Sequence, residues 1–127
     1  MNILLVDDKK TVLSSISAFL EDEGHDVTTA LNGLQAFEQT HVNDFDLFII
    51  DHLMPVMDGI QLAKRLKKQA QTAYLPILFM STQDIKSIEH LAENQFVDHL
   101  LSKPINFEKL AELLKGYATK NSVNLSL

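Results

Sequence analysis

Short apolar runs alternate along the whole chain with segments that have the spacing of amphipathic helices. We expect the apolar runs to be strands; they span residues 3–6, 27–30, 47–50, 76–80 and 96–101. Several runs are continuously apolar, which is typical of parallel strands that are covered on both faces. Strict alternation of strand and helix predicts an α/β fold, in which right-handed crossovers place helices on both faces of a parallel sheet.

Helical spacing predicts a helix after each expected strand. The first helical stripe covers residues 12–20 and is closed by Gly24. The apolar positions that mark the later helices are Leu34 and Phe37, then Ile60, Ala63 and Leu66, then Ile85, Ile88 and Leu91, and finally Phe107, Leu110, Leu113, Leu114 and Tyr117. Residues 119–127 show no such stripe. We therefore expect a domain over residues 1–118, followed by a tail or the start of a linker at 119–127.

Composition excludes several classes of protein. A chain of 127 residues suits one compact domain. The net charge is −6 and no basic block is present, which argues against direct binding of nucleic acid. No apolar run approaches the roughly 20 residues that span a bilayer, and the N-terminus lacks the pattern of a signal peptide. We therefore expect a cytoplasmic protein that is not attached to a membrane.

Polar residues follow four of the five expected strands. They are Asp7 and Asp8, Asp51, Ser81 and Thr82, and Lys103 with Pro104. In an open α/β sheet, ligands bind outside the carboxyl ends of the strands, so these side chains should meet if the first and third strands are neighbours. Three carboxylates in one cleft raise each other's pKa unless a hard divalent cation lies among them. The pattern predicts a Mg²⁺ site, and Lys103 beside it favours a further anionic ligand such as a phosphoryl group.

At these positions the chain resembles the receiver domain of bacterial two-component response regulators. The resemblance rests on Asp7-Asp8, "DHLMPVMDG" at 51–59, Ser81 and Lys103-Pro104, in this order and spacing, and it covers residues 2–118. The segment "GHDVTTALNGLQAF" at 24–37 resembles the second strand and helix of the family. The resemblance implies a flavodoxin-like (βα)5 fold with strand order 2-1-3-4-5.

The family's functional residues carry over to matching positions of this chain. Asp51 is implied to be the phosphoacceptor, which takes a phosphoryl group from a histidine kinase or a histidine phosphotransfer protein. Asp8, Asp51 and the backbone carbonyl of Leu53 are implied to bind Mg²⁺, with Asp7 holding a bound water. Ser81 is implied to bind one phosphoryl oxygen and Lys103 another. The peptide bond before Pro104 is implied to be cis.

The resemblance also implies a signalling output. Phosphorylation should reshape the surface of the fourth helix, fifth strand and fifth helix, which would bind a downstream protein, an effector domain outside this chain, or a second copy in a phosphorylation-dependent homodimer. Three positions, Thr82, Gln83 and Leu100, are expected to tune or transmit the switch; Leu100 stands where the family usually has an aromatic residue. The side chain of Leu53, which flanks the site together with Gln83, is a further position that tunes phosphoryl hydrolysis in this family. The small pair that usually precedes the fifth strand falls near Phe96 and Val97.

The same residues allow other interpretations. Asp7 and Asp8 could cap the first helix, and Asp58 is expected to cap the third. A phosphatase of the haloacid dehalogenase kind needs D-x-D after the first strand, but position 9 is Lys9. The four glycines are too scattered for a dinucleotide site, and the five histidines lack ligand spacing, so we expect surface or satisfied histidines. The prediction is a non-enzyme that at most dephosphorylates itself slowly; an unphosphorylated interaction scaffold remains the alternative.

Overall fold

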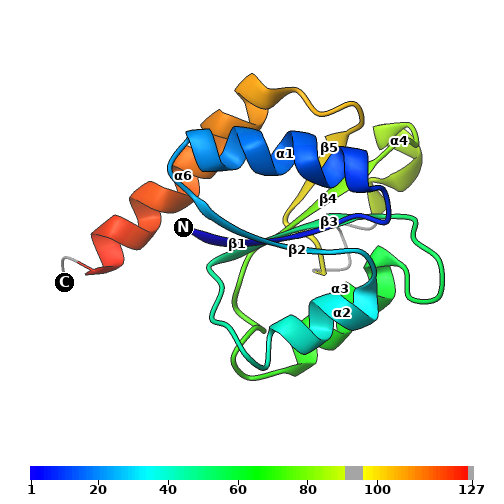
Figure 1. Ribbon diagram of the computed structural model, residues 1–127, viewed down its shortest axis with the longest axis horizontal. Helices are drawn as coiled ribbons and strands as arrows, with labels where there is room; N and C mark the ends of the chain where they lie inside the picture. The colour runs from blue at the N-terminus through cyan, green and yellow to red at the C-terminus, as the bar shows by residue number, and fades with distance from the viewer. Residues whose placement is uncertain (91–95, 126–127) are drawn as a thin grey trace.

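The computed structural model describes residues 1–90 and 96–125, except for the side chains of residue 85 and residues 119–125. Its centre is a five-stranded parallel sheet with the order β2-β1-β3-β4-β5. The strands are β1 (Asn2–Val6), β2 (Asp26–Ala30), β3 (Leu47–Asp51), β4 (Ile77–Ser81) and β5 (His99–Ser102). This order confirms the predicted flavodoxin-like fold and makes β1 and β3 neighbours (Figure 1).

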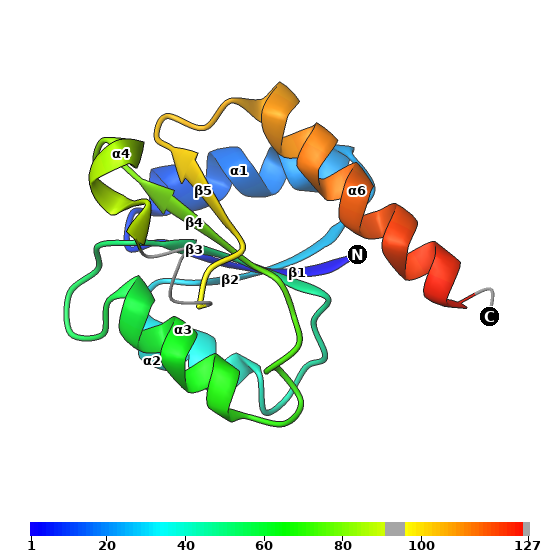
Figure 2. The same ribbon diagram turned by 180° about the vertical axis from the view of Figure 1, so that it is seen from behind.

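Helices cover both faces of the sheet. They are α1 (Lys10–Asp22), α2 (Gly33–Gln39), α3 (Gly59–Lys68), α4 (Ile85–Ile88) and α6 (Phe107–Leu125). Figures 1 and 2 show α1 and α6 on one face and α2 and α3 on the other. Among the described residues, no helix combines the length and apolar character needed to cross a membrane.

The continuous apolar strands supply both halves of the core because successive side chains of a strand point to opposite faces. Ile3 and Leu5 pack with α1 and α6 through residues such as Leu13 and Leu110. The intervening residues Leu4 and Val6, in contrast, pack in a second cluster with Leu62, Ala63 and Leu66 of α3. The inner strands β3 and β4 are buried along their whole length, whereas the edge strands β2 and β5 are partly exposed.

The fifth strand begins later than the sequence predicts. The expected range was 96–101, but β5 covers His99–Ser102. Val97 is buried in one of the two core clusters, and Phe96 packs against that cluster. Neither residue is paired in the sheet. Asp98 marks the start of pairing, since its backbone N–H donates to the Ile77 carbonyl and its carboxylate accepts from the Ile77 N–H at 2.7 Å. Packing rather than pairing explains the two apolar residues.

The expected fourth helix falls partly outside the described residues, and the last helix ends later than the sequence predicts. Of the positions expected in the fourth helix, Leu91 lies outside the described residues, and α4 ends at Ile88. The last helix extends to Leu125, so residues 119–125 of the expected tail or linker start are helical although they lack an apolar stripe. The buried residues Leu110 and Leu114 anchor this helix, and no glycine or proline follows Gly116 to stop it. Extending a formed helix is much easier than nucleating one, so it continues past the packed stripe.

Candidate functional site

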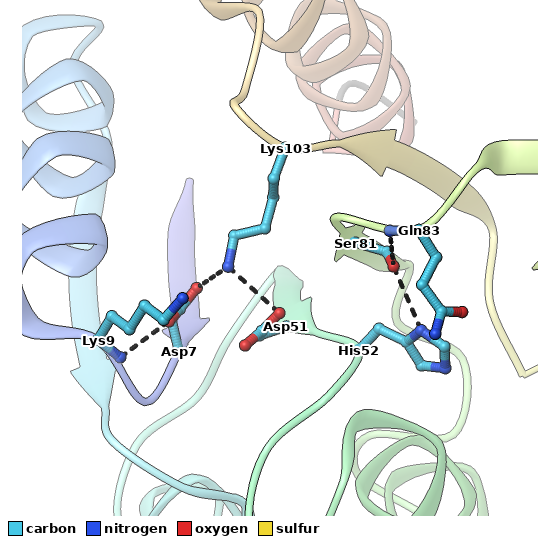
Figure 3. Close-up of polar contacts among 7 residues, drawn as sticks. All are labelled: Asp7, Lys9, Asp51, His52, Ser81, Gln83 and Lys103. Atoms are coloured by element: carbon cyan, nitrogen blue, oxygen red, sulfur yellow. Dashed lines mark hydrogen bonds and ion pairs between the residues drawn. The ribbon is translucent and has the colours of Figure 1, made fainter.

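The polar residues predicted to converge do so at the carboxyl edge of the sheet. Asp51 is the last residue of β3 and Ser81 the last of β4, while Asp7 directly follows β1 and Lys103 directly follows β5. Three of these residues line a cavity of about 170 Å³, whose full lining is Asp8, Lys9, Asp51, Leu53, Ser81, Thr82 and Lys103. Figure 3 shows Asp51, Ser81 and Lys103 together with Asp7. The parallel register brings these strand ends together, because every strand of the sheet points the same way.

Three carboxylates form the acidic part of the site. Oxygens of Asp7, Asp8 and Asp51 lie within 4.8 Å of one another. Asp7 is fully buried and Asp51 is 6% exposed, whereas Asp8 is exposed at the mouth. The side chain of Asp7 does not cap α1, whose N-cap is Lys9 and has no side-chain cap bond.

Lys103 links the two buried carboxylates. Its Nζ donates to Asp7 Oδ2 at 2.7 Å and to Asp51 Oδ1 at 3.3 Å (Figure 3). The loop that carries it is held to β4, because the Lys103 N–H donates to the Ser81 carbonyl at 2.8 Å. The Lys103–Pro104 peptide bond is cis, as the family resemblance implies. The ammonium group therefore lies inside the acidic cluster and not merely at its rim.

The electrostatic environment gives Asp51 a higher pKa than an ordinary aspartate has. Burial, and then the charge of Asp7, raise the pKa of Asp51 from 3.8 to about 6, although Lys103 acts in the opposite direction. For Lys103, burial acts to lower the pKa, but the hydrogen bond to Asp7 and the charges of both aspartates outweigh it and raise the pKa. At neutral pH the site therefore holds an ionised Asp51 that lacks full compensation.

The donor set suits a hard divalent cation. Oxygen ligands at the edge of a water-accessible cavity are what Mg²⁺ prefers. Asp7 Oδ1 accepts from the Lys9 N–H at 2.9 Å, and its Oδ2 accepts from Lys103, so both of its oxygens are already engaged. Among the described residues, the carboxylates of Asp8 and Asp51 have fewer hydrogen-bond partners than the carboxylate of Asp7, and Leu53 lines the same cavity. The incompletely compensated charge on Asp51 and the exposed carboxylate of Asp8 fit a cation.

Ser81 also lines the cavity, and its hydroxyl oxygen has hydrogen-bond partners of its own. The side chain is 2% exposed, and its Oγ accepts from the Gln83 N–H at 3.0 Å. The same Oγ lies 3.4 Å from Nδ1 of His52 (Figure 3). The predicted site serine therefore lines the cavity, but its partners Gln83 and His52 lie outside the acidic cluster.

His52 is a site residue that the sequence interpretation missed. It is 7% exposed, it follows Asp51 directly, and its ring stacks on Phe79 with centroids 5.8 Å apart. Burial lowers the pKa of His52, opposed by the charge of Asp58. The expectation of a surface or satisfied histidine is correct in that its Nδ1 has a partner. The position of His52 directly after the buried strand β3 indicates a place at the site. The spacing of metal ligands, on which the histidines were judged, does not reveal such a position.

The loop between β3 and α3 places the phosphoacceptor candidate against a helix start. Asp58 caps α3 as predicted: its carboxylate accepts from the Gln61 N–H at 2.9 Å, and the Gln61 side chain accepts from the Asp58 N–H at 3.0 Å. A Cβ added to Gly59 would lie 2.5 Å from the Asp51 carbonyl oxygen. Only glycine allows α3 to start so close to the end of β3.

The three expected switch positions have different surroundings. Thr82 and Gln83 are exposed, and Thr82 lines the cavity. Leu100 is half-buried in β5 and packs against the core cluster that contains α3 residues and Ile88 of α4. Leu100 is thus connected to the helix-covered face and not to the cavity.

Comparison with known proteins agrees with this geometry. The family model of the response regulator receiver domain matches residues 3–115. The protein PilH of Pseudomonas aeruginosa is 30% identical over 90% of this chain and 94% of its own length. The probable transcriptional regulator ycf29 of Porphyra purpurea is 33% identical over 97% of this chain.

Coverage of the relatives differs. The chain spans 59% of ycf29 and 50% of the Bacillus subtilis regulator PhoP, so it matches about half the length of several curated relatives. Among solved structures, chemotaxis protein CheY4 of Vibrio cholerae is similar with a TM-score of 0.85 and 31% identity, over 91% of this chain and 97% of that one. A two-component response regulator from Clostridium difficile has a TM-score of 0.86 and 26% identity, over 94% and 96%. By family model, fold and relatives, this chain belongs to the response regulator receiver domain family, a family of signalling modules in two-component systems.

Proposed function

We propose that this receiver domain accepts a phosphoryl group on Asp51 from a histidine kinase or a histidine phosphotransfer protein. The observation that carries the proposal is the placement of Asp51: a nearly buried carboxylate, 6% exposed, that lines an open cavity together with Lys103 and Ser81. Phosphoryl transfer depends mainly on positioning and on charge stabilisation, and these neighbours can supply both.

The chemical step needs an ionised nucleophile. A carboxylate oxygen of Asp51 would form a bond to phosphorus while the P–N bond to the donor's imidazole breaks, and the imidazole takes up a proton as it leaves. With a pKa of about 6, Asp51 is mostly ionised at neutral pH. The Lys103 ammonium, now 3.3 Å from Asp51 Oδ1, is within reach of an oxygen of the new phosphoryl group.

Asp8, Asp51 and the Leu53 carbonyl would hold Mg²⁺, and Asp7 would act through a bound water. The engagement of both Asp7 oxygens by Lys9 and Lys103 favours this indirect role. When bound, Mg²⁺ would neutralise charge on the phosphoryl oxygens and help to orient them.

The proposed output is a change in the surface formed by α4, β5 and α6. Ser81 ends β4 and Lys103 follows β5, so movement of either toward a phosphoryl group would act on the loops that lead to α4 and α6. Thr82, Gln83 and Leu53 would tune the lifetime of the phosphoryl group, and Leu100 would pack against the moving loop. In this proposal residues 1–118 form the receiver, residues 119–127 a tail or linker start, and the site is not that of a turnover enzyme.

The partners belong to the same proposal. After phosphorylation, the α4–β5–α6 surface would bind a downstream protein, an effector domain or a second copy of the chain. The histidine kinase or phosphotransfer protein would phosphorylate the receiver domain in the cytoplasm. The relatives support this range, since PilH has nearly the length of this chain while ycf29 and PhoP are longer regulators.

Chemical phosphorylation tests the function. Incubation with acetyl phosphate and Mg²⁺ should add one acid-labile phosphoryl group, and Asp51→Asn should abolish it. Intact-protein and peptide mass spectrometry measure the number and position of the groups. Labelling of a serine or histidine would show that the nucleophile is misassigned, and no labelling under any condition would favour an unphosphorylated scaffold.

The metal assignment has its own test. Asp8→Asn should weaken Mg²⁺ binding markedly, because it removes one anionic ligand, while Asp22→Asn on an exposed turn of α1 should not. Titration of Mg²⁺ followed by NMR measures both affinities. Equal affinity in Asp8→Asn and wild type would rule out the proposed ligand.

A further inference from the structure

The hydroxyl of Ser81 is held by two partners on the side of His52. Its Oγ accepts from the Gln83 N–H at 3.0 Å and lies 3.4 Å from His52 Nδ1. Figure 3 shows the carboxylates of Asp7 and Asp51 directed toward Lys103, while the hydroxyl is directed toward the imidazole of His52. The serine and the acidic cluster are therefore separate hydrogen-bonding groups in this form of the protein.

His52 is a fixed partner. Its backbone N–H donates to the Met80 carbonyl at 2.8 Å, and its carbonyl accepts from the Gly59 N–H at 2.9 Å. The imidazole stacks on Phe79 with an interplanar angle of 25°. Because backbone and ring are both restrained and the side chain is buried, the position of Nδ1 is set by the surrounding core.

A serine hydroxyl has one proton to donate and two lone pairs to accept with. The Gln83 N–H occupies one lone pair. His52 Nδ1, 3.4 Å away, can accept the proton in the neutral tautomer that carries its hydrogen on Nε2, which is the tautomer that the inference assigns to His52. A hydroxyl that donates to Nδ1 must give up that bond before it can donate to a phosphoryl oxygen on Asp51. The imidazole and the phosphoryl group would then compete for one proton.

We propose that His52 is a positioning residue that retains the Ser81 hydroxyl in the unphosphorylated form and so opposes the switch. The inference rests on the proposed function of Asp51 as phosphoacceptor. The imidazole acts through Ser81 and needs no contact with the phosphoryl group. Its removal should favour the phosphorylated arrangement, because the hydroxyl loses its competing partner.

The test is the affinity for beryllium fluoride in the presence of Mg²⁺, measured in the chain of residues 1–127 and in its variants. His52→Phe keeps an aromatic ring on Phe79 but has no acceptor, and it should bind the probe about 3- to 10-fold more tightly, as loss of one neutral hydrogen bond predicts. His52→Asn keeps a polar atom at the branch position of Nδ1, and its affinity should stay within about twofold of wild type.

A second background separates this role from packing. In Ser81→Ala the hydroxyl is absent, so His52→Phe should then leave the affinity for beryllium fluoride unchanged. An equal gain from His52→Phe in both backgrounds would overturn the proposal, as would a gain in His52→Asn equal to that in His52→Phe.

The bond can also be tested without any phosphoryl analogue. In the apoprotein, the ¹⁵N chemical shift of His52 Nδ1 should change between wild type and Ser81→Ala, because an accepted hydrogen bond is lost. An unchanged shift would refute the bond itself. If wild type binds no beryllium fluoride, the proposed phosphoacceptor function fails, and this measurement still decides whether His52 holds Ser81.

Discussion

At the scale of single residues, the buried charges of the site work against the stability of the folded chain. Asp7 is fully buried and Asp51 nearly so, and the side chain of the ammonium that joins them is 10% exposed. Buried ion pairs rarely repay the loss of solvation, and a charge left without its partner is strongly unfavourable. The arrangement that would suit the proposed phosphoryl transfer is thus kept at a cost in folding free energy.

The pKa of Asp51 makes one part of this cost depend on pH. Because the pKa is 3.8 ordinarily and about 6 in the folded chain, the folded state binds the proton more tightly, and stability decreases as pH rises from 4 to 6. Asp51→Asn avoids this loss, so at pH 7 without metal it should be more stable than wild type by up to about 3 kcal/mol. The difference should vanish below pH 4.

Urea denaturation of wild type and Asp51→Asn in EDTA between pH 3.5 and 8 measures this difference. Asp22→Asn, which alters an exposed carboxylate at the end of α1, is the control and should give a nearly constant difference. A gain in stability of Asp51→Asn that is the same at pH 4 and pH 7 would exclude ionisation of Asp51 as its cause.

Lys103 should matter for folding as well as for phosphorylation. Lys103→Met removes the ammonium that lies 2.7 Å from fully buried Asp7, and it should lower the free energy of unfolding by roughly 3–5 kcal/mol. Exposed Lys10→Met should change it by less than about 0.5 kcal/mol. Thermal and urea denaturation provide the values.

The double variant identifies the origin of that loss. Asp7→Asn combined with Lys103→Met removes both charges and should recover much of the lost stability. Additive losses in the double variant would mean that Lys103 stabilises the chain by some route other than its pair with Asp7.

At the scale of elements, the site depends on how closely α3 approaches the end of β3. The Asp58–Gln61 capping box fixes the first turn of α3, and the Gly59 N–H donates to the His52 carbonyl at 2.9 Å. These contacts connect the helix start to the residue that follows Asp51. The orientation of Asp51, the proposed phosphoacceptor, is therefore a property of the strand, the loop and the helix together.

Gly59→Ala tests this dependence. The new Cβ would meet the Asp51 carbonyl oxygen at 2.5 Å and the His52 Cα at 3.1 Å, both of them backbone atoms, so the loop must shift. We expect a loss of about 1–3 kcal/mol in stability and a roughly 10- to 100-fold slower phosphorylation by acetyl phosphate.

Gly116 provides the matched control. It lies within α6, it is exposed, and nothing lies within 4 Å of an added Cβ. Gly116→Ala should raise the free energy of unfolding by about 0.5–1 kcal/mol and leave the phosphorylation rate unchanged. If both variants lose stability, the loss in Gly59→Ala would reflect a general intolerance of an added methyl group and not the close approach of Gly59 to Asp51.

At the scale of the whole molecule, the sheet separates two core clusters that meet different helices. One contains α1 and α6, and the other contains α2, α3 and Ile88 of α4. The site lies at the carboxyl edge of the sheet, where the loops to α4 and to α6 both begin. A new charge at this edge can therefore act on both faces through β4 and β5.

Hydrogen exchange should detect this response. With beryllium fluoride and Mg²⁺, backbone amides of α4, β5 and the start of α6 should change their exchange rates, because Ser81 and Lys103 would move toward the new charge. Exchange followed by mass spectrometry measures the change, and Asp51→Asn should show none. Changes confined to α2 and α3 would contradict the proposed output surface.

The sequence by itself determined the strand and helix alternation and most of the site. Continuous apolar runs identified the buried strands β1, β3 and β4, because only strands covered on both faces are apolar throughout. The same logic placed Asp51 and Ser81 at strand ends, since each acidic or hydroxyl residue interrupts an apolar run. Local pattern was sufficient wherever the environment of a residue follows from its neighbours in sequence.

Tertiary structure alone decided the remaining features. Phe96 and Val97 look like strand residues but pack without pairing, and α6 continues where its stripe has ended. The bond between His52 and Ser81 joins residues 29 positions apart. The sequence predicts Lys103 near the aspartates, but not that its shortest contact is with Asp7, 96 positions away. Such contacts depend on which strand lies beside which and on the register of their pairing. Periodicity carries no information on either, because it reports only which face of an element is buried.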